Sequence, residues 1–328
     1  MSAEFRVFHG LEEIPEDFGP SALTIGNFDG VHAGHRRILR RVVAVAAERG
    51  LRPSALTFDP HPTRIVAPAR APRLMTTPAQ RAEIMRAEGI LQVVILPFDQ
   101  KFSHLAPERF VEQIVVESLR ARAVLVGDNF RFGFQHAGDT RLLAALGERL
   151  GFTTEIVPAV RLRGETVSSS AARRLIQAGQ VSRAARALER PYGVEGDVIP
   201  GHGVGSRQTV PTLNLRTSAE LLPAAGVYVT RTFDLDCGQQ WDSVTNVGYR
   251  PTFGGNELTI ETFLLTWLTG DPPRRIRVEF LYRLRDERKF PSPAELKVQI
   301  LRDVRRAQAF FRRASRWVSG RPPDRAVS

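Results

Sequence analysis

The feature that most constrains this chain is a regular alternation of short apolar runs with amphipathic helices between Ser21 and about Val157. Such alternation predicts a mainly parallel sheet that is covered by helices on both faces. One helix is predicted to begin at the capping box Thr77-Pro78-Ala79-Gln80, and another at Pro107. The predicted strands are residues 22–25, 54–58, 92–97, 123–126 and 153–157. The first part of the chain is therefore expected to be an α/β, doubly wound domain.

The pattern changes after Gly179, where short strands separated by Gly, Pro, Asp and Asn follow one another. This pattern is typical of an antiparallel barrel or sandwich. A capping box at Ser292 then begins a helix whose apolar residues, Leu296, Ile300, Val304 and Phe311, recur on one face that is expected to pack on the barrel. The strands are predicted at 192–198, 226–233, 243–247, 258–267 and 275–284. We place the domains at 1–186 and 187–318, with a disordered tail over 319–328.

Composition narrows the classes of protein to consider. A chain of 328 residues is long enough for two cores, and no apolar run approaches the roughly 18 to 20 residues of a membrane span. The amino-terminal residues show no signal-peptide pattern, and the one cysteine, Cys237, agrees with a reducing compartment. We therefore expect a cytoplasmic protein with no membrane partner.

The net charge of +11 invites a nucleic-acid interpretation, because basic side chains neutralise phosphates. Much of the excess, however, is arginine that lies in one segment, between Arg302 and Arg325. We expect no nucleic-acid partner. Anionic small substrates are equally compatible with this charge.

A glycine- and histidine-rich stretch, IGNFDGVHAGH at residues 25–35, follows the first predicted strand and opens a helix that ends at Gly50. His32 and His35 share a face at the helix start, where free backbone N–H groups favour anions. The glycines Gly26, Gly30 and Gly34 would permit close backbone approach. These residues together describe a phosphate site. Taken alone, they leave a structural histidine pair or a weak metal site equally open.

Three further polar segments are expected to lie at the same place. Phe58-Asp59-Pro60-His61-Pro62 follows the second strand, Gly127-Asp128-Asn129-Phe130 follows the fourth, and Ser168-Ser169-Ser170 precedes Arg173 at a helix start. Each has a structural alternative as a turn, core or cap. Because ligands of open parallel sheets bind outside the carboxyl ends of the strands, we expect the segments to surround one cleft.

These four motifs resemble the adenylyltransferase module of the bacterial bifunctional riboflavin kinase/FMN adenylyltransferase family, over roughly residues 5 to 185. The resemblance implies a Rossmann-like nucleotidyltransferase fold that transfers the adenylyl group of ATP to FMN and releases pyrophosphate. It implies that His32 and His35 contact ATP phosphates and that Arg173 stabilises the leaving pyrophosphate. It further implies ATP contacts at Gly26, Phe28, Gly30, Gly34, Ser168, Ser169 and Ser170, and contacts with the flavin or magnesium at Asp29, Asp59, Asn129 and Phe130.

A glycine-rich loop, PGHGVGSRQTVPTLNL at residues 200–215, leads into a strand of the second domain. Three spaced glycines bind nothing by themselves, but the segment resembles the riboflavin kinase module of the same family. The resemblance implies that Gly201, Gly203 and Gly205 contact phosphate and that Thr212 and Asn214 hold Mg²⁺. Leu213 replaces the family's alanine and should point to the opposite strand face. Thr209 stands where the family more often has glycine.

A glutamate in a later strand is the candidate base of this module. In Ile260-Glu261-Thr262, strand alternation places Glu261 opposite to its neighbours, on what is expected to be the inner face of the barrel. An unpaired carboxylate there would be costly, and an exposed strand glutamate is the alternative. The resemblance implies that Glu261 is the general base for phosphorylation of riboflavin.

The leading hypothesis is an enzyme of FAD biosynthesis in which the barrel makes FMN from riboflavin and ATP, and the α/β domain makes FAD from FMN and ATP. The alternatives are an enzyme whose kinase module is weakened at Leu213 and Thr209, and a non-catalytic flavin- or RNA-binding protein. The expected partners are riboflavin, FMN and ATP with Mg²⁺, and the expected state is a monomer or a weak homo-oligomer.

Overall fold

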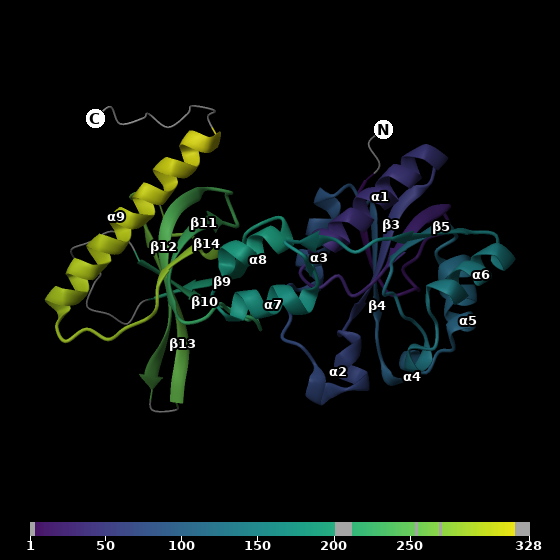
Figure 1. Cartoon of the computed structure of the whole chain (residues 1–328), viewed down its shortest axis with the longest axis horizontal. Helices are drawn as coiled ribbons and strands as arrows, with labels where there is room; N and C mark the ends of the chain where they lie inside the picture. The colour runs from purple at the N-terminus through teal and green to yellow at the C-terminus, as the bar shows by residue number, and fades with distance from the viewer. Residues whose placement is uncertain (1–3, 201–211, 253–254, 269–270, 319–328) are drawn as a thin grey trace. The chain divides into compact units, whose positions relative to one another are not determined.

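The computed structural model of the chain describes residues 4–200, 212–252, 255–268 and 271–318 (Figure 1). The chain divides into two units, residues 1–172 and residues 173–328, and each is described by itself. In these described ranges, no helix has an apolar stretch long enough to cross a membrane.

The first unit is built on a parallel six-stranded sheet with the strand order β1-β4-β3-β2-β5-β6. Its strands are β1 (Arg6–His9), β2 (Ser21–Ile25), β3 (Arg52–Asp59), β4 (Gln92–Pro97), β5 (Ala121–Gly127) and β6 (Thr153–Val157), with a small hairpin of β7 (Arg161–Leu162) and β8 (Glu165–Thr166). Its helices are α1 (Ala33–Arg49), α2 (Pro62–Val66), α3 (Pro78–Ala87), α4 (Gln100–Ser103), α5 (Pro107–Arg109) and α6 (Thr140–Leu150), with short 3-10 turns η1 (Pro68–Arg70) and η3 (Phe134–His136). The five predicted strands are all present, and β1 at the edge was missed.

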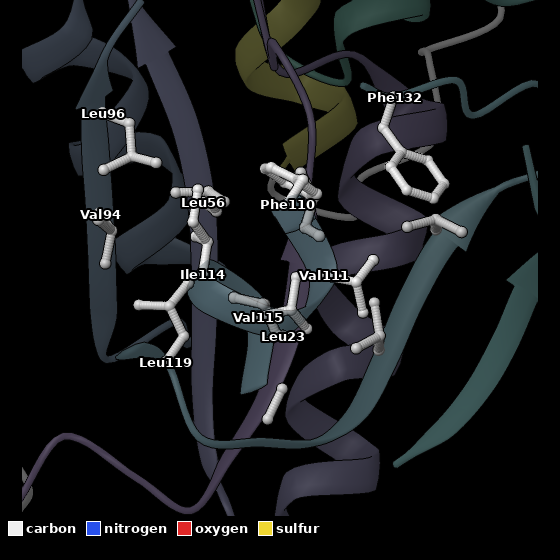
Figure 2. Close-up of a cluster of buried hydrophobic side chains, with 14 of the residues drawn as sticks. Leu23, Leu56, Val94, Leu96, Phe110, Val111, Ile114, Val115, Leu119 and Phe132 are labelled. Carbon is white, nitrogen blue, oxygen red and sulfur yellow. The ribbon is translucent and has the colours of Figure 1, made fainter. Parts of the chain in front are cut away.

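Both faces of this sheet are buried, as a doubly wound fold requires. Figure 2 shows one face, where Leu23, Leu56 and Val94 meet Phe110 and Ile114 of the helix η2 (Phe110–Ser118). On the other face, the next residues along each strand, among them Ala22, Ala55 and Val93, pack on the buried side of α1. Alternate residues of each strand therefore supply two separate cores.

The helix predicted from Pro107 differs from the expected α-helix. Only Pro107–Arg109 is α-helical, and the chain continues as a π-helix in which the Leu119 N–H donates to the Ile114 carbonyl at 2.9 Å. The apolar pattern correctly predicted a helix, but it carries no information about the wider turn.

The second unit is a closed antiparallel barrel with the strand order β10-β13-β12-β11-β14-β9. Its strands are β9 (Tyr192–Ile199), β10 (Thr212–Arg216), β11 (Gly226–Asp234), β12 (Gln240–Thr252), β13 (Gly255–Leu264) and β14 (Arg275–Arg285). Helix α7 (Ser169–Gln177) crosses the division between the units, and α8 (Val181–Leu188) packs on β14, where the Ser182 hydroxyl donates to the Leu281 carbonyl at 2.9 Å. The predicted boundary after residue 186 therefore falls inside α8, and the structure divides the chain earlier because α8 packs with the barrel.

The inside of the barrel holds a chain of hydroxyl groups as well as apolar side chains. The chain runs Thr232–Ser243–Thr230–Thr245–Thr262, with oxygen-to-oxygen distances between 2.7 and 2.9 Å, and all five residues are fully buried. Each hydroxyl has a partner within the chain, so this polar interior avoids the cost of unsatisfied buried groups.

The carboxyl-terminal helix α9 (Pro293–Val318) is present and runs alongside β11 and β12 (Figure 1). The face predicted for it was wrong in its first half, where Leu296 and Ile300 are 41% and 39% exposed. Gln299 and Asp303 are buried instead, ahead of Ala307 and Phe311. The reason is a polar contact: the Arg285 guanidinium donates to Asp303 at 2.9 Å, and the Gln299 amide donates to the same carboxylate at 2.9 Å. The predicted tail over 319–328 lies outside the described residues.

Candidate active sites

The predicted histidine pair meets at the amino end of α1. His32 is the N-cap of the helix, and its Nδ1 accepts a hydrogen bond of 3.4 Å from the His35 N–H. The two imidazole rings stack with centroids 3.7 Å apart and planes inclined by 17°. A Cβ at Gly34 would lie 3.0 to 3.1 Å from the His32 ring, so a glycine here lets that ring lie close to the helix backbone. The two rings therefore lie at the amino end of the helix, where backbone N–H groups favour anions.

His35 is half-buried, and aromatic rings lie against its imidazole. The Phe28 ring contacts it edge-on at 5.0 Å, and its buried Nδ1 has no hydrogen-bond partner among the described residues. Desolvation, together with the neighbouring His32 ring, lowers the pKa of His35 well below 6.5. The ring is therefore neutral near pH 7 and retains a hydrogen-bonding nitrogen for a ligand.

The loop that precedes these histidines has an unusual backbone that its surroundings hold in place. Phe28 and Val31 adopt positive φ angles of 49° and 37°, which non-glycine residues rarely do. The buried Asp29 carboxylate accepts hydrogen bonds from the N–H groups of Met75 (2.9 Å) and Thr76 (3.2 Å). This geometry supports an anchoring role for Asp29, and its contact with flavin or magnesium stays a prediction.

The other predicted segments of this unit lie beside the same loop. Since β3 and β5 both pair with β2, the exposed Asp59 at the end of β3 and the exposed Asn129 after β5 flank the histidine loop. Phe130 is half-buried and stacks on Phe132 at 5.4 Å. The sequence therefore predicted correctly that these segments gather at one edge of the sheet.

The serine run reaches this loop as well. The Ser169 hydroxyl donates to the Asp29 carbonyl at 2.9 Å, and the Ser168 hydroxyl accepts from the Ala171 N–H at 3.2 Å, which caps α7. Ser170 is exposed in the first turn of this helix, and Arg173 follows Ser169 by about one turn. These contacts are structural, so the phosphate contacts of Ser168 and Ser169 stay predictions.

The barrel brings its predicted residues together across neighbouring strands. Asn214 of β10 lies directly opposite Glu261 of β13, and Glu261 lies directly opposite Asn246 of β12. Directly opposed residues of antiparallel strands point to the same face, so the three side chains form one row. Thr212, two residues before Asn214 on β10, shares their face and is exposed.

The expectation that Glu261 faces the barrel interior was wrong. Ile260, Thr262 and Leu264 are the buried residues of β13, and Thr262 belongs to the internal hydroxyl chain, so Glu261 points outward and is half-buried. Leu213 is buried in the interior, on the opposite face from Asn214, as the alternation predicted. Thr209, Gly201, Gly203 and Gly205 lie outside the described residues.

Comparisons with known proteins match both parts of the chain to families. Residues 14–171 match the family model for FAD synthetase, and residues 188–311 match the model for riboflavin kinase. A bifunctional riboflavin kinase/FMN adenylyltransferase from Pseudomonas fluorescens is 35% identical, with 93% of this chain and 97% of that protein covered. The chain belongs to the bifunctional riboflavin kinase/FMN adenylyltransferase family. It is an enzyme of FMN and FAD biosynthesis, which confirms the leading hypothesis from the sequence.

One further relative and one solved structure show how far the likeness extends. The bifunctional riboflavin kinase/FMN adenylyltransferase of Haemophilus influenzae is 32% identical, with 93% of this chain and 99% of that protein covered. A crystal structure described as a macrolide-efflux protein from Streptococcus pneumoniae has a TM-score of 0.81 at 25% identity and covers 92% of this chain and 98% of its own. The expected α/β domain, barrel and terminal helix are confirmed.

The residues present in the barrel fit the magnesium that the family resemblance implies. Among the described residues, no group of three or more His, Cys, Asp and Glu could enclose a metal ion. Thr212 and Asn214 instead offer two neutral oxygens on one strand face, beside the Glu261 carboxylate. Mg²⁺ prefers oxygen ligands, keeps several waters and commonly binds together with nucleotide phosphates, so such a sparse set of donors suits it.

Sequence reasoning missed several residues that hold these sites. Arg81 is fully buried, and its guanidinium donates to the Asn27 carbonyl at 2.7 Å and to the Thr57 hydroxyl at 3.0 Å. Asn246, in the row with Glu261, received no predicted role from the sequence. The burial of Arg81 gives no sequence signal, because its acceptors, two carbonyl groups and the Thr57 hydroxyl, lie far away in the sequence.

Proposed function

We propose that the α/β unit transfers the adenylyl group of ATP to FMN, with His32 and His35 as the groups that hold the ATP phosphates. The supporting observation is the stacked ring pair at the start of α1, with a neutral His35 whose buried Nδ1 has no hydrogen-bond partner among the described residues. In this reaction a phosphate oxygen of FMN attacks the α-phosphorus of ATP, and the bond to pyrophosphate breaks. The substrate supplies the nucleophile, so catalysis depends on positioning and on stabilisation of charge.

Further predicted residues would complete the binding of two anions for adenylyl transfer. We assign Arg173 to the leaving pyrophosphate and the flanking residues Asp59, Asn129 and Phe130 to the flavin end. Gly26, Phe28, Gly30, Gly34 and the serines 168–170 would line the nucleotide side. The contact of Ser169 with the loop after β2, and the places of Asp59 and Asn129 beside that loop, support this division, because charge-assisted hydrogen bonds act at short range.

We propose that the barrel phosphorylates riboflavin, with Glu261 as general base. Glu261 would accept the proton of the ribityl 5′-hydroxyl as that oxygen attacks the γ-phosphorus of ATP, and ADP would leave. The placement of Asn214 directly opposite Glu261 supports this assignment. Thr212 and Asn214 would hold Mg²⁺, which when bound neutralises phosphate charge.

The cellular setting is proposed on fewer observations. We propose a cytoplasmic enzyme that acts on small molecules, without a nucleic-acid partner, as a monomer or weak homo-oligomer. The one cysteine, Cys237, is exposed and unpaired, which supports a reducing compartment.

The test uses the two units as controls for each other. The purified protein is incubated with ATP, Mg²⁺ and either riboflavin or FMN, and the flavins are separated by chromatography. His32→Ala should lower FAD formation by about 100- to 1,000-fold, the range for loss of one donor that stabilises charge, while FMN formation continues. Glu261→Gln should lower FMN formation by about 100- to 10,000-fold and leave conversion of supplied FMN unchanged. FAD synthesis near the wild-type rate in His32→Ala, or kinase turnover near the wild-type rate in Glu261→Gln, would refute the assignment concerned.

A further inference from the structure

Arg81 is one of the largest fully buried side chains in the described part of the molecule, and it joins two loops of the adenylyltransferase site. Its Nη1 donates to the Asn27 carbonyl at 2.7 Å and also lies 3.4 Å from the Phe58 carbonyl, which Nη2 contacts at the same distance. Asn27 belongs to the histidine loop, and Phe58 immediately precedes Asp59. The guanidinium therefore spans the main chains of both segments.

A second residue reinforces the same connection. The Thr57 hydroxyl accepts from Arg81 Nη1 at 3.0 Å and donates to the Asn27 carbonyl at 3.2 Å. The Asn27 carbonyl thus has two donors, one from α3 and one from β3. Planar guanidinium groups suit such a task, because their N–H groups point in fixed directions toward several acceptors.

The residues just before α3 hold the other end of the loop. Met75 and Thr76 bind the Asp29 carboxylate, and the Thr76 hydroxyl accepts from the Gly30 N–H at 3.0 Å. Residues 75–81 therefore hold the histidine loop at Asn27 and again at Asp29 and Gly30. Backbone at positive φ, as at Phe28 and Val31, persists where its surroundings fix it from more than one side.

We propose that Arg81 is a positioning residue for adenylyl transfer, which keeps the histidine loop and the Asp59 turn at the separation that lets ATP and FMN react. This inference rests on the proposed function of the α/β unit. In this role Arg81 acts through the carbonyl groups of Asn27 and Phe58, which adjoin predicted substrate contacts in the sequence. The burial of a charged group in this position has a functional reason, because a misplacement of reacting groups by about 1 Å can cost about 100-fold in rate.

Electrostatics agree with a fixed cation behind this site. Burial lowers the pKa of Arg81, while the nearby carboxylates of Asp29 and Asp59 raise it. A guanidinium stays protonated in proteins, so the charge persists whichever substrate is bound.

The first test compares Arg81→Met with Arg81→Lys in the full chain, with FMN as substrate. Arg81→Met should lower kcat for FAD formation by about 30- to 100-fold and change the KM values for ATP and FMN by less than about threefold, because alignment is lost rather than binding. Arg81→Lys keeps the charge but not the planar fork, and it should recover only part of kcat. Arg86→Met, on the exposed side of the same helix, is the matched control and should behave as the wild type.

The second test is a double-mutant cycle with Thr57→Val, a substitution that keeps the branched shape and removes the hydroxyl. Thr57→Val alone should lower kcat by about three- to tenfold, and adding it to Arg81→Met should lower kcat little further, since both act on the Asn27 carbonyl. Independent, multiplicative losses would contradict a shared role at that carbonyl.

Folding and function are separated by the second activity of the same chain. Riboflavin kinase turnover should be unchanged in every variant, and circular dichroism should show an intact fold. A folded Arg81→Met enzyme with wild-type kcat would overturn the inference, as would a variant that loses FAD synthesis only in proportion to its unfolded fraction. Should Arg81→Met not fold, Arg81→Lys and Thr57→Val decide on the same criteria. Absence of FAD synthesis in the wild type would instead refute the proposed function.

Discussion

The two units place their candidate residues in contrasting ways. The α/β unit carries them on loops beyond the carboxyl ends of β2, β3 and β5, where the backbone is strained and buried side chains hold it. The barrel carries Asn246, Glu261 and Asn214 on the regular face of three paired strands. A site on loops needs anchors elsewhere in the chain, whereas strand pairing alone sets the register of a site on strands. The first site should therefore be sensitive to distant substitutions, and the second should not.

The substitution expected to affect the α/β site most, relative to the barrel site, is Asp29→Ala. The substitution leaves the Met75 and Thr76 N–H groups without their buried acceptor, which costs about 1–3 kcal/mol for each unsatisfied group. FAD formation should fall by at least about 30-fold as the histidine loop relaxes. Hydrogen exchange should show faster exchange of the amides of Met75 and Thr76. Unchanged FAD synthesis would show that the loop does not need this anchor, and it would contradict the proposed contrast between the loop site and the strand site.

The barrel's counterpart is the buried hydroxyl chain. Thr245→Val removes an internal hydroxyl of the chain, which bonds Thr230 at 2.7 Å and Thr262 at 2.9 Å, and should destabilise the barrel by about 1–3 kcal/mol. Thr232→Val at the end of the chain removes one bond and should cost less. Hydrogen exchange of β12 amides measures both, and kinase turnover of the folded enzyme should not change. A kinase loss as large as that in Glu261→Gln would mean that the interior, too, positions the barrel site.

The parts that sequence predicted well are those that depend on alternation and strand order. The predicted strands at 92–97 and 153–157 have the bounds of β4 and β6, and the histidine spacing correctly predicted one shared helix face. The inward side of β13 was assigned wrongly, because Thr262 becomes a good interior residue only through hydroxyl partners on other strands. Alternation separates two faces, but it does not tell which face is inside when both carry polar groups.

Long-range polar contacts account for the other failures. The buried face of α9 includes Asp303 because Arg285 on β14 donates to its carboxylate. The positions of apolar residues along the helix do not reveal this partner. Arg81 is buried because carbonyl groups at Asn27 and Phe58 accept from it, and main-chain acceptors leave no mark in a sequence. The candidate residues themselves were predictable from their motifs, while the residues that hold them were not.

A smaller effect on FAD formation is expected for Gly34→Ala, which adds a single methyl group to the loop site. In Gly34→Ala the new Cβ would press on the His32 ring, and FAD formation should fall by about tenfold. Helix propensity works in the other direction, since alanine within a helix is favoured over glycine by about 1 kcal/mol. The variant should thus lose adenylyl transfer without losing stability. Kinetics and thermal unfolding of the same sample measure the two, and a full rate of FAD formation would show that the ring tolerates displacement.

The smallest expected effect is a pH dependence that belongs to the α/β unit alone. The pKa of His35 lies well below 6.5, so its ring is neutral in the free enzyme at about pH 7. ATP phosphates beside the ring would favour the protonated form and raise that pKa, so binding takes up protons and tightens as the pH falls. From about pH 8 to about pH 6 the KM for ATP in FAD formation should fall by about threefold more in the wild type than in His35→Gln. Titration of ATP itself is common to both proteins and cancels in this comparison. The KM for ATP in riboflavin phosphorylation should not differ between them. Equal pH profiles for FAD formation in the two proteins would show that His35 does not contact the ATP phosphates.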